Sequence, residues 1–290
     1  MIKASLCCDP DTINQLEDVL YELAPSNWSL VVNRITEKGN LEGFFESKAQ
    51  ALESIDELKT LLAVKLSQTF VIADIPDQDW KEAYKSHFEP WSHGKIHWVP
   101  EWEKNSYEIP PEHHAVYLDP GMAFGTGNHE TTRLCLESMI SILEGFEPFD
   151  LLDVGCGSGI LSLSANLLGI EKVKGVDNDP DSIKVSNENL HANNITGNVA
   201  FEAISLEKFS DEENFDIVVA NIQADILMAN SRTLLQLVRK GGYVVLSGIL
   251  SKETKLVKEH FLANLDEANL DYEVETRSLG EWSVIQTRIH

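Results

Sequence analysis

The amino-acid sequence predicts an α/β protein in which a small ferredoxin-like α+β domain precedes a Rossmann-like domain with a seven-stranded sheet. Three observations carry this prediction. Residues 1–75 have the pattern of strands and helices in the order βαββαβ. Residues 150–177 have the pattern of a β-α-β unit with a glycine-rich first turn. The residues after 177 continue as alternating strands and helices that end in a hairpin.

The ferredoxin-like domain is predicted over residues 1–75. Its helical segments carry apolar residues on one stripe, and the first of them has Ile13, Leu16 and Leu20 at helical spacing. No catalytic constellation is visible in this stretch, so it is expected to recognise a partner or to serve as a scaffold. The expected strands are 2–8, 28–35, 41–45 and 69–75 with a hairpin turn at 38–40, and the expected helices are 11–23 and 49–65.

A helical linker is predicted over residues 76–88. Pro76 ends the first domain, and a short polar helix follows with Trp80, Tyr84 and Phe88 on one face. The aromatic face and the polar composition are typical of a connector between two domains.

The second domain is predicted over residues 89–290 and begins with a hairpin whose turn contains Gly94. His87, His93 and His97 lie near this hairpin, but their spacing is not a compact set of metal ligands. We therefore expect packing or surface histidines, and no metal. The further strands are expected at 114–118, 151–154, 173–176, 199–204, 215–222, 243–249, 272–278 and 282–289, and the further helices at 131–143, after Gly159, at 179–194, at 224–239 and from Ser251.

The glycine turn indicates a ligand of the nucleotide type. Gly155, Gly157 and Gly159 follow a buried strand, where a turn that approaches a ligand closely must tolerate positive φ and has no room for a Cβ. Asp177 closes the next strand, where a carboxylate can accept hydrogen bonds from both hydroxyls of a ribose. Ile160 stands where the dinucleotide fingerprint GxGxxG needs glycine, so a nicotinamide cofactor is disfavoured. A tight turn without a ligand remains the alternative.

Two further segments are expected at the same crevice. The loop at 119–132 contains Phe124 and Gly125 and runs into a helix near Thr132, a pattern that suits a carboxylate or another polar ligand group but also an ordinary helix cap. Asn221 ends a strand buried on both faces, and ligands of open α/β sheets lie beyond the carboxyl ends of strands.

Composition narrows the classes of partner and compartment. The formal net charge is −24, and no compact cluster of Lys and Arg is present, so a basic protein is a better partner than free nucleic acid. The alternative is that the charge serves solubility alone. No long uncharged apolar run and no signal-peptide core occur, so we expect a cytoplasmic protein without membrane contact. The four cysteines lack CxxC spacing, which disfavours structural zinc and disulfides.

Several motifs resemble one family, the ribosomal protein L-eleven methyltransferases (PrmA family), within the class I S-adenosylmethionine (SAM) methyltransferases. They are DQDWKEAY, HFEPW, LDPGMAFGTGNHETT, LLDVGCGSGIL, GVDNDP, VVANI, LSGIL and GEW, which together span residues 77–282. The resemblance implies a SAM-dependent enzyme with a methyltransferase domain that methylates amino groups of a large-subunit ribosomal protein, and an N-terminal recognition domain on a helical linker. It implies cofactor contacts at Thr132, Gly155, Asp177 and Asn221.

One segment departs from the family pattern. Family members have a stretch similar to NILAxPL after the strand, whereas this chain has Asn221-Ile-Gln-Ala-Asp-Ile-Leu, which lacks the proline and places Asp225 near the mouth of the site. The cofactor site survives this change, but the acceptor side of the site differs. The tetrapeptide NPPY or DPPY of amide and adenine amino methyltransferases is absent, which further disfavours nucleic acid as the substrate.

The expected chemistry assigns two catalytic candidates. Asn221 is expected to orient the acceptor amine through its side-chain carbonyl, and His129 is a candidate proton acceptor, although a loop histidine that covers the cofactor is favoured for it. The alternatives are methylation of another lysine-rich protein or of a small amine, and SAM binding without turnover in an assembly factor.

Overall fold

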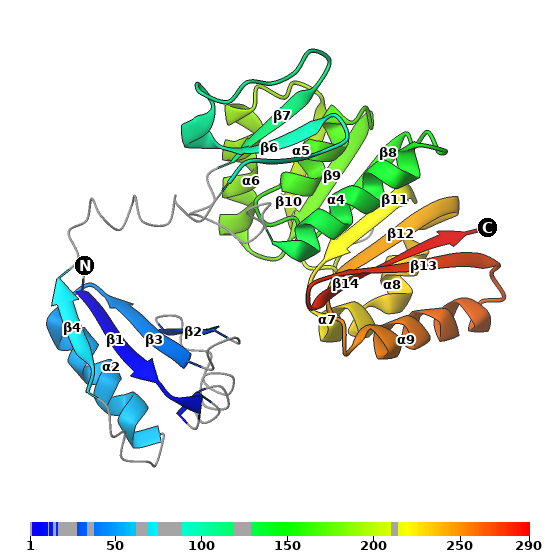
Figure 1. The fold of residues 1–290 in the computed structure, drawn as a ribbon. Helices are drawn as coiled ribbons and strands as arrows, with labels where there is room; N and C mark the ends of the chain where they lie inside the picture. The colour runs from blue at the N-terminus through cyan, green and yellow to red at the C-terminus, as the bar shows by residue number, and fades with distance from the viewer. Residues whose placement is uncertain are drawn as a thin grey trace. The chain divides into compact units, whose positions relative to one another are not determined.

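The computed structural model describes residues 2–10, 12–13, 16, 28–33, 38–61, 69–74, 89–118, 129–209 and 214–290 (Figure 1). Contacts between residues divide the chain into two compact units, Met1–His87 and Phe88–His290. The predicted linker helix at 77–88 lies outside the described residues. Each unit is therefore described by itself.

The first unit contains a four-stranded antiparallel sheet in the order β2-β3-β1-β4. Helix α2 packs on β1 and β3, and its Ala51, Ile55 and Leu58 join Leu6 and Leu41 in one core. The helix predicted at 11–23 falls largely outside the described residues. The elements of this unit are β1 (Ile2–Cys8), β2 (Trp28–Asn33), β3 (Lys38–Phe45), α2 (Lys48–Leu61) and β4 (Val71–Asp74).

The hairpin turn predicted at 38–40 is wrong. These residues belong to β3, and Asn33 pairs with Lys38 while Val31 pairs with Asn40. Gly39 is there for close packing, because a Cβ at this position would lie 2.7 Å from Cγ1 of Ile13.

The second unit is built on a mixed sheet of seven strands in the order β10-β9-β8-β11-β12-β14-β13. The first five strands of this order are parallel to one another, and β14 runs antiparallel to both of its neighbours. The strands are β8 (Asp150–Val154), β9 (Lys172–Asp177), β10 (Asn198–Ala203), β11 (Phe215–Asn221), β12 (Val238–Leu250), β13 (Tyr272–Leu279) and β14 (Trp282–Ile289). This is the α/β class that the sequence predicts.

Helices cover both faces of this sheet (Figure 1). Helices α4 (Glu130–Leu143) and α5 (Ile160–Leu167) bury apolar side chains on one face, and α7 (Ala224–Ala229), α8 (Ser231–Gln236) and α9 (Thr254–Glu267) do so on the other. Helix α6 (Pro180–Ala192) lies against β9 and β10. Because strand side chains alternate between the faces, a central strand such as β11 supplies apolar residues to both cores.

A smaller sheet of three strands packs on the face that α4 and α5 cover. It consists of β5 (Trp91–His93), β6 (Ile96–Pro100) and β7 (His114–Leu118), and a 3-10 helix, η2 (Glu101–Glu103), begins the crossover from β6 to the parallel strand β7. The predicted hairpin with Gly94 at its turn is confirmed, and Gly94 has a φ of 56°. Within the described ranges, no helix combines the length and the apolar character that crossing a membrane requires.

The single helix predicted at 224–239 is wrong. Two short helices, α7 and α8, meet at Asn230, whose φ of −109° and ψ of 14° are not helical. Val238 already belongs to β12 and pairs with Phe215 of β11. Val238 is only 5% exposed in the sheet, and valine favours strands over helices, so pairing with β11 is preferred to a further helical turn.

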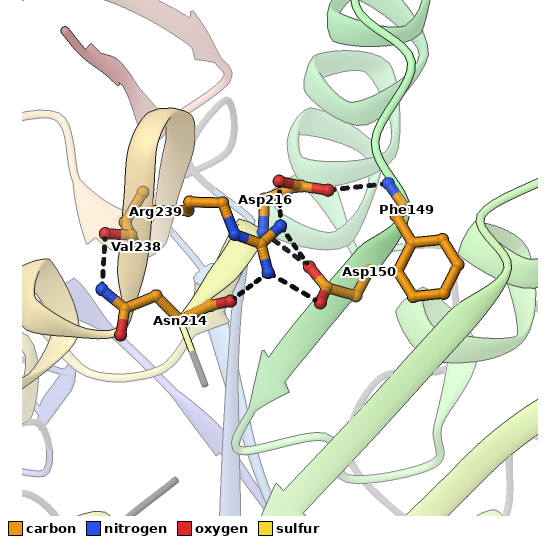
Figure 2. Close-up of polar contacts among 6 residues, drawn as sticks. All are labelled: Phe149, Asp150, Asn214, Asp216, Val238 and Arg239. Atoms are coloured by element: carbon orange, nitrogen blue, oxygen red, sulfur yellow. Dashed lines mark hydrogen bonds and ion pairs between the residues drawn. The ribbon is translucent and has the colours of Figure 1, made fainter. Parts of the chain in front are cut away.

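Three central strands are joined at their amino ends by one guanidinium (Figure 2). Arg239 of β12 pairs with Asp216 of β11 and donates to Asp150 of β8 at 3.2 Å, and it also donates to the carbonyl of Asn214 at 2.6 Å. Two backbone hydrogen bonds complete the cluster. The N–H of Phe149 donates to Oδ2 of Asp216 and the N–H of Asp216 donates to Oδ1 of Asp150, each at 2.7 Å. This cluster lies at the opposite end of the strands from the glycine turn.

Candidate functional site

The carboxyl ends of three parallel strands bring the predicted site residues to one edge of the sheet. Val154 of β8 pairs with both Val176 of β9 and Ala220 of β11, so the residues that follow these positions emerge side by side. Asp177 and Asn221 are two of these residues. Open α/β sheets bind their ligands at this edge, which agrees with the expectation from sequence.

The glycine turn after β8 has a backbone that only glycine accommodates. Gly155 and Gly159 have φ values of 70° and 79°. A Cβ on Gly155 would lie 2.4 Å from Cγ2 of Ile222, and one on Gly159 would lie 2.9 Å from Phe201 and from Ser186. The turn is tied to β9, because the backbone N–H groups of residues 155 and 156 both donate to the carbonyl of Val176. The turn is therefore held in place at the carboxyl end of β8, and the side chains of its two non-glycine residues, Cys156 and Ser158, are buried.

Asp177 faces this turn. Its Oδ2 accepts a hydrogen bond from the backbone N–H of Gly157 at 3.0 Å, and its Oδ1 accepts one from Asp179 at 3.0 Å. A carboxylate has about four acceptor positions, so two remain for hydroxyl groups of a ligand. The structure thus holds the carboxylate in a fixed orientation beside the glycines.

Asp153 is a buried residue whose structural part the sequence pattern did not reveal. Its Oδ2 accepts hydrogen bonds from the backbone N–H and the hydroxyl of Ser162, at 3.1 and 2.6 Å, and so fastens the start of α5 beneath the turn. Burial raises the pKa of this carboxyl to about 7, against the opposing effect of the Ser162 hydrogen bonds. An acidic residue inside the apolar run from Leu151 to Val154 is the only signal in the sequence.

Asn221 and Thr132 meet at the other side of the crevice. The Nδ2 of Asn221 donates to the Oγ1 of Thr132 at 3.4 Å, and Thr132 is fully buried. The Oδ1 of Asn221 is also buried, and no described residue donates a hydrogen bond to it. A buried carbonyl oxygen without a donor costs about 1 to 3 kcal/mol, so this atom is suited to a ligand that brings a donor.

His129 begins helix α4 and caps it. Its Nδ1 accepts from the backbone N–H of Thr131 at 3.4 Å and lies 2.8 Å from the hydroxyl of the same residue. Its ring meets that of Trp282 edge to face, with centroids 5.1 Å apart. Acceptance at Nδ1 places the proton of a neutral ring on Nε2.

The remaining predicted site residues are placed as follows. Phe124 and Gly125 lie outside the described residues. Asp225 is exposed in the first turn of α7, and its Oδ1 accepts from the N–H of Ile226 at 2.9 Å. Ile226, which stands at the position of the missing proline, is 45% exposed.

The histidines near the first hairpin form a different contact from the one their sequence spacing invites. His97 is buried, and its Nδ1 lies 2.9 Å from the hydroxyl of Tyr107 while its Nε2 lies 2.8 Å from Nδ1 of His113. Burial, and then the neighbouring His113, lower the pKa of His97. Within the described ranges, no three His, Cys, Asp or Glu side chains gather as metal ligands.

Comparisons with known proteins agree with this geometry. The model of the family "Ribosomal protein L11 methyltransferase (PrmA)" matches residues 9–289. The chain belongs to this family. A ribosomal protein L11 methyltransferase of Geobacter sulfurreducens is 34% identical, with 98% of this chain and 97% of that protein covered. One of Pelobacter propionicus is 40% identical over 218 residues, which are 73% of this chain and 67% of that protein.

A solved structure extends the agreement to the fold of this PrmA-family chain. The ribosomal protein L11 methylase of Lactobacillus delbrueckii subsp. bulgaricus matches with a TM-score of 0.61 and 28% identity. The match covers 70% of this chain and all of that one. The resemblance inferred from the motifs is thereby confirmed at the level of the family.

Proposed function

We propose that this protein transfers a methyl group from SAM to amino groups of ribosomal protein L11 in the cytoplasm. The observation that carries the proposal is the Oδ1 of Asn221, a buried acceptor to which none of the described residues donates and which lies at the same edge of the sheet as the glycine turn. Relatives along the whole chain bear the name of this activity. An amine is a donor that would satisfy this atom.

The described residues fit SAM as the cofactor. The glycine turn has positive φ at Gly155 and Gly157, as a turn that approaches a ligand closely requires, and the open acceptor positions of Asp177 suit the two hydroxyls of a ribose. Thr132 and Asn221 supply polar atoms on the opposite side, and Phe124 and Gly125 remain predicted contacts outside the described residues. When bound, the cofactor supplies an activated methyl group on a sulfonium sulfur, and the leaving group is a neutral thioether.

The task of the protein is then to align the amine and to exclude water. Asn221 orients the amine through its Oδ1, while its Nδ2 donates to Thr132. The side chain of Asn221 is therefore held in one orientation and carries no charge. Losing the proton costs about 4.6 kcal/mol at pH 7 for a lysine amine of pKa about 10.4, but only about 1 to 1.4 kcal/mol for an α-amine of pKa about 7.7 to 8.0. An N-terminal α-amine is therefore the easier acceptor, and lysine side chains need more help from the site.

His129 is the remaining candidate for proton acceptance. Its Nδ1 is engaged with Thr131, so in the neutral ring Nε2 carries the proton and is not a base. A capping role that orders the start of α4 next to Thr132 is the better supported one.

The domain organisation belongs to the same proposal. Residues 1–75 form a ferredoxin-like recognition domain, residues 76–88 a helical linker, and residues 89–290 a Rossmann-like methyltransferase domain. Support comes from the antiparallel strand order of the first unit, the seven-stranded mixed sheet of the second, and the division of the chain at Phe88.

Mass spectrometry of the large ribosomal subunit tests this function. Cells that lack the protein should yield L11 without the methyl groups that are present in parent cells, and purified protein with labelled SAM should restore them. Methylation of other lysine-rich proteins or of small amines, with L11 untouched, would favour the first alternative. SAM binding without any turnover would favour an assembly factor.

A further inference from the structure

Two asparagines of helix α6 form hydrogen bonds to segments outside the helix, one to the glycine turn and one to the end of β7. The helix begins immediately after Asp177, where Asp179 caps it by accepting from the N–H of Asp181 at 2.9 Å. Its last turns carry Asn189 and, at the C-cap, Asn193. The two asparagines are four residues apart and therefore lie on one face of the helix.

Asn189 holds the glycine turn. Its Nδ2 donates to the carbonyl of Ser158 at 2.9 Å, and Asn189 is only 9% exposed. Ser158 stands between Gly157 and Gly159, which both have positive φ. The asparagine therefore supplies a fixed anchor to the part of the turn that approaches the ligand.

Asn193 holds the end of β7. Its Oδ1 accepts from the N–H of Tyr117 at 2.7 Å, and its Nδ2 donates to the carbonyl of Tyr117 at 2.7 Å. One amide side chain thus pairs both backbone groups of an edge residue, as a neighbouring strand would. Its Nδ2 also donates to the carbonyl of Asn189 at 2.8 Å, which joins the two asparagines in one network.

Lys104 strengthens this junction. Its Nζ donates to the carbonyl of Ala192 at 2.9 Å and lies 4.9 Å from the centre of the Tyr117 ring. The positive charge of Lys104 also interacts favourably with the negative, carboxyl end of the α6 dipole. The end of β7 is therefore bound to α6 by side chains from two different elements.

We propose that Asn189 and Asn193 are positioning residues for cofactor binding, which set the place of the glycine turn relative to the end of β7. The inference rests on the proposed function, because the glycine turn is assigned there to SAM. Neither side chain touches the acceptor atom of Asn221, so the pair acts on cofactor affinity and not on the transfer step. A helix of 13 residues is stiff enough to transmit the restraint along its length.

The test uses the full chain and compares three asparagines of the same helix. Asn189→Ala and Asn193→Ala each remove hydrogen bonds to another element, whereas Asn187→Ala removes a bond within the helix, from Nδ2 to the carbonyl of Ile183 at 2.7 Å. In titration calorimetry we expect the first two variants to lower the affinity for SAM by about fivefold to thirtyfold, and the third to lower it by less than about twofold. The KM for SAM should rise in the same proportion, while kcat at saturating SAM stays within about twofold.

Asn189→Asp and Asn193→Asp serve if an alanine variant fails to fold. Aspartate keeps the size of the side chain but cannot donate to the carbonyl of Ser158 or of Tyr117 at neutral pH. We expect the same rise in the KM for SAM. The unfolding temperature without SAM is measured for every variant.

The outcomes separate this inference from the proposed function. Variants that unfold at lower temperature but bind SAM as tightly as the parent would show that the asparagines only stabilise the fold, and the inference would be overturned while the function stands. A kcat that falls with an unchanged KM would also overturn it. If the parent protein does not bind SAM at all, the proposed function and this inference fail together.

Discussion

The Nδ2 of Asn221 donates to the Oγ1 of Thr132 at 3.4 Å and joins the end of β11 to the first turn of α4. This bond fixes the orientation of the asparagine amide, because a side-chain amide that donates through nitrogen must present its oxygen elsewhere. The oxygen is the buried atom that receives no hydrogen bond from the described residues. The pair therefore holds a carbonyl ready for an incoming donor.

Asn221→Ala should lower the methylation rate more than it lowers the affinity for SAM. Alignment of the acceptor amine is lost in the transition state, whereas the other cofactor contacts remain. Single-turnover rates with L11 and SAM binding by calorimetry, measured on the same preparation, check this. Equal losses in both would make Asn221 a cofactor contact only.

Thr132→Val is the matched variant on the other side of the bond. Valine keeps the shape of the buried threonine but leaves Nδ2 of Asn221 without its acceptor. We expect a smaller loss of rate than for Asn221→Ala, because the amide remains but is less well oriented. In the double variant the two losses should not add, since both changes act through one hydrogen bond.

Asp177→Ala should weaken the binding of SAM by about 1.5 to 3 kcal/mol, which is about 13-fold to 160-fold, through loss of charge-assisted hydrogen bonds. Calorimetry measures the affinity, and circular dichroism checks that the variant is folded. Glu188→Gln, which removes an exposed carboxylate of α6, is the control and should bind SAM as the parent does. Unchanged affinity in a folded Asp177→Ala would refute the assignment of the glycine turn.

The sequence predicts the strand order along the chain and the edge where Asp177 and Asn221 meet, because glycine spacing and buried strands are local signals. It does not predict long-range side-chain contacts. Val238 is read as helical because its pairing with Phe215 depends on tertiary contact. The bond that fastens α5 to Asp153 spans nine residues and the bonds from Asn193 to Tyr117 span 76, and no spacing rule predicts either contact.

Arg239→Met should destabilise the fold by about 2 to 4 kcal/mol, because Asp150 would remain buried beside Asp216 without a counter-charge. The guanidinium is 42% exposed, so solvent moderates the loss. Arg232→Met is the control, since its pair with Glu267 is exposed on both sides and is worth at most about 1 kcal/mol. Denaturant unfolding measures both, and equal losses would show that the buried cluster contributes no more than a surface ion pair.

Stability should fall as the pH rises through about 7 because of Asp153. Its pKa is raised to about 7 in the fold from an ordinary value of 3.8, so the stabilising effect of its proton is complete below pH 3.8 and is lost as the pH passes 7. The loss is at most about 4 kcal/mol, from roughly three pKa units. Asp153→Asn keeps an acceptor for Ser162 and should be more stable than the parent at pH 8 but similar at pH 4. A parent and variant whose unfolding free energies keep the same difference at both pH values would refute the assignment.

Recognition and chemistry should be separable between the two units. The predicted recognition domain, of about 75 residues, has enough surface for an interface of roughly 800 Å² per partner, which a glycine turn cannot supply. A chain that begins at Asp77 keeps every described contact of the cofactor edge, since these all lie within Phe88–His290. It should bind SAM with near-parent affinity but methylate L11 poorly.

Shortening the predicted linker at 77–88 tests the same separation without removing a domain. One docked substrate must be presented in several orientations if several amines are to be methylated, and a shorter tether reaches fewer of them. We expect SAM affinity to stay unchanged while product mass spectra lose some of the modified positions. SAM binding and product spectra are to be measured side by side for the parent, the truncated and the shortened protein. Full activity of the truncated protein at the same positions would show that residues 1–75 do not select the substrate, and the methyltransferase domain would then have to recognise L11 by itself.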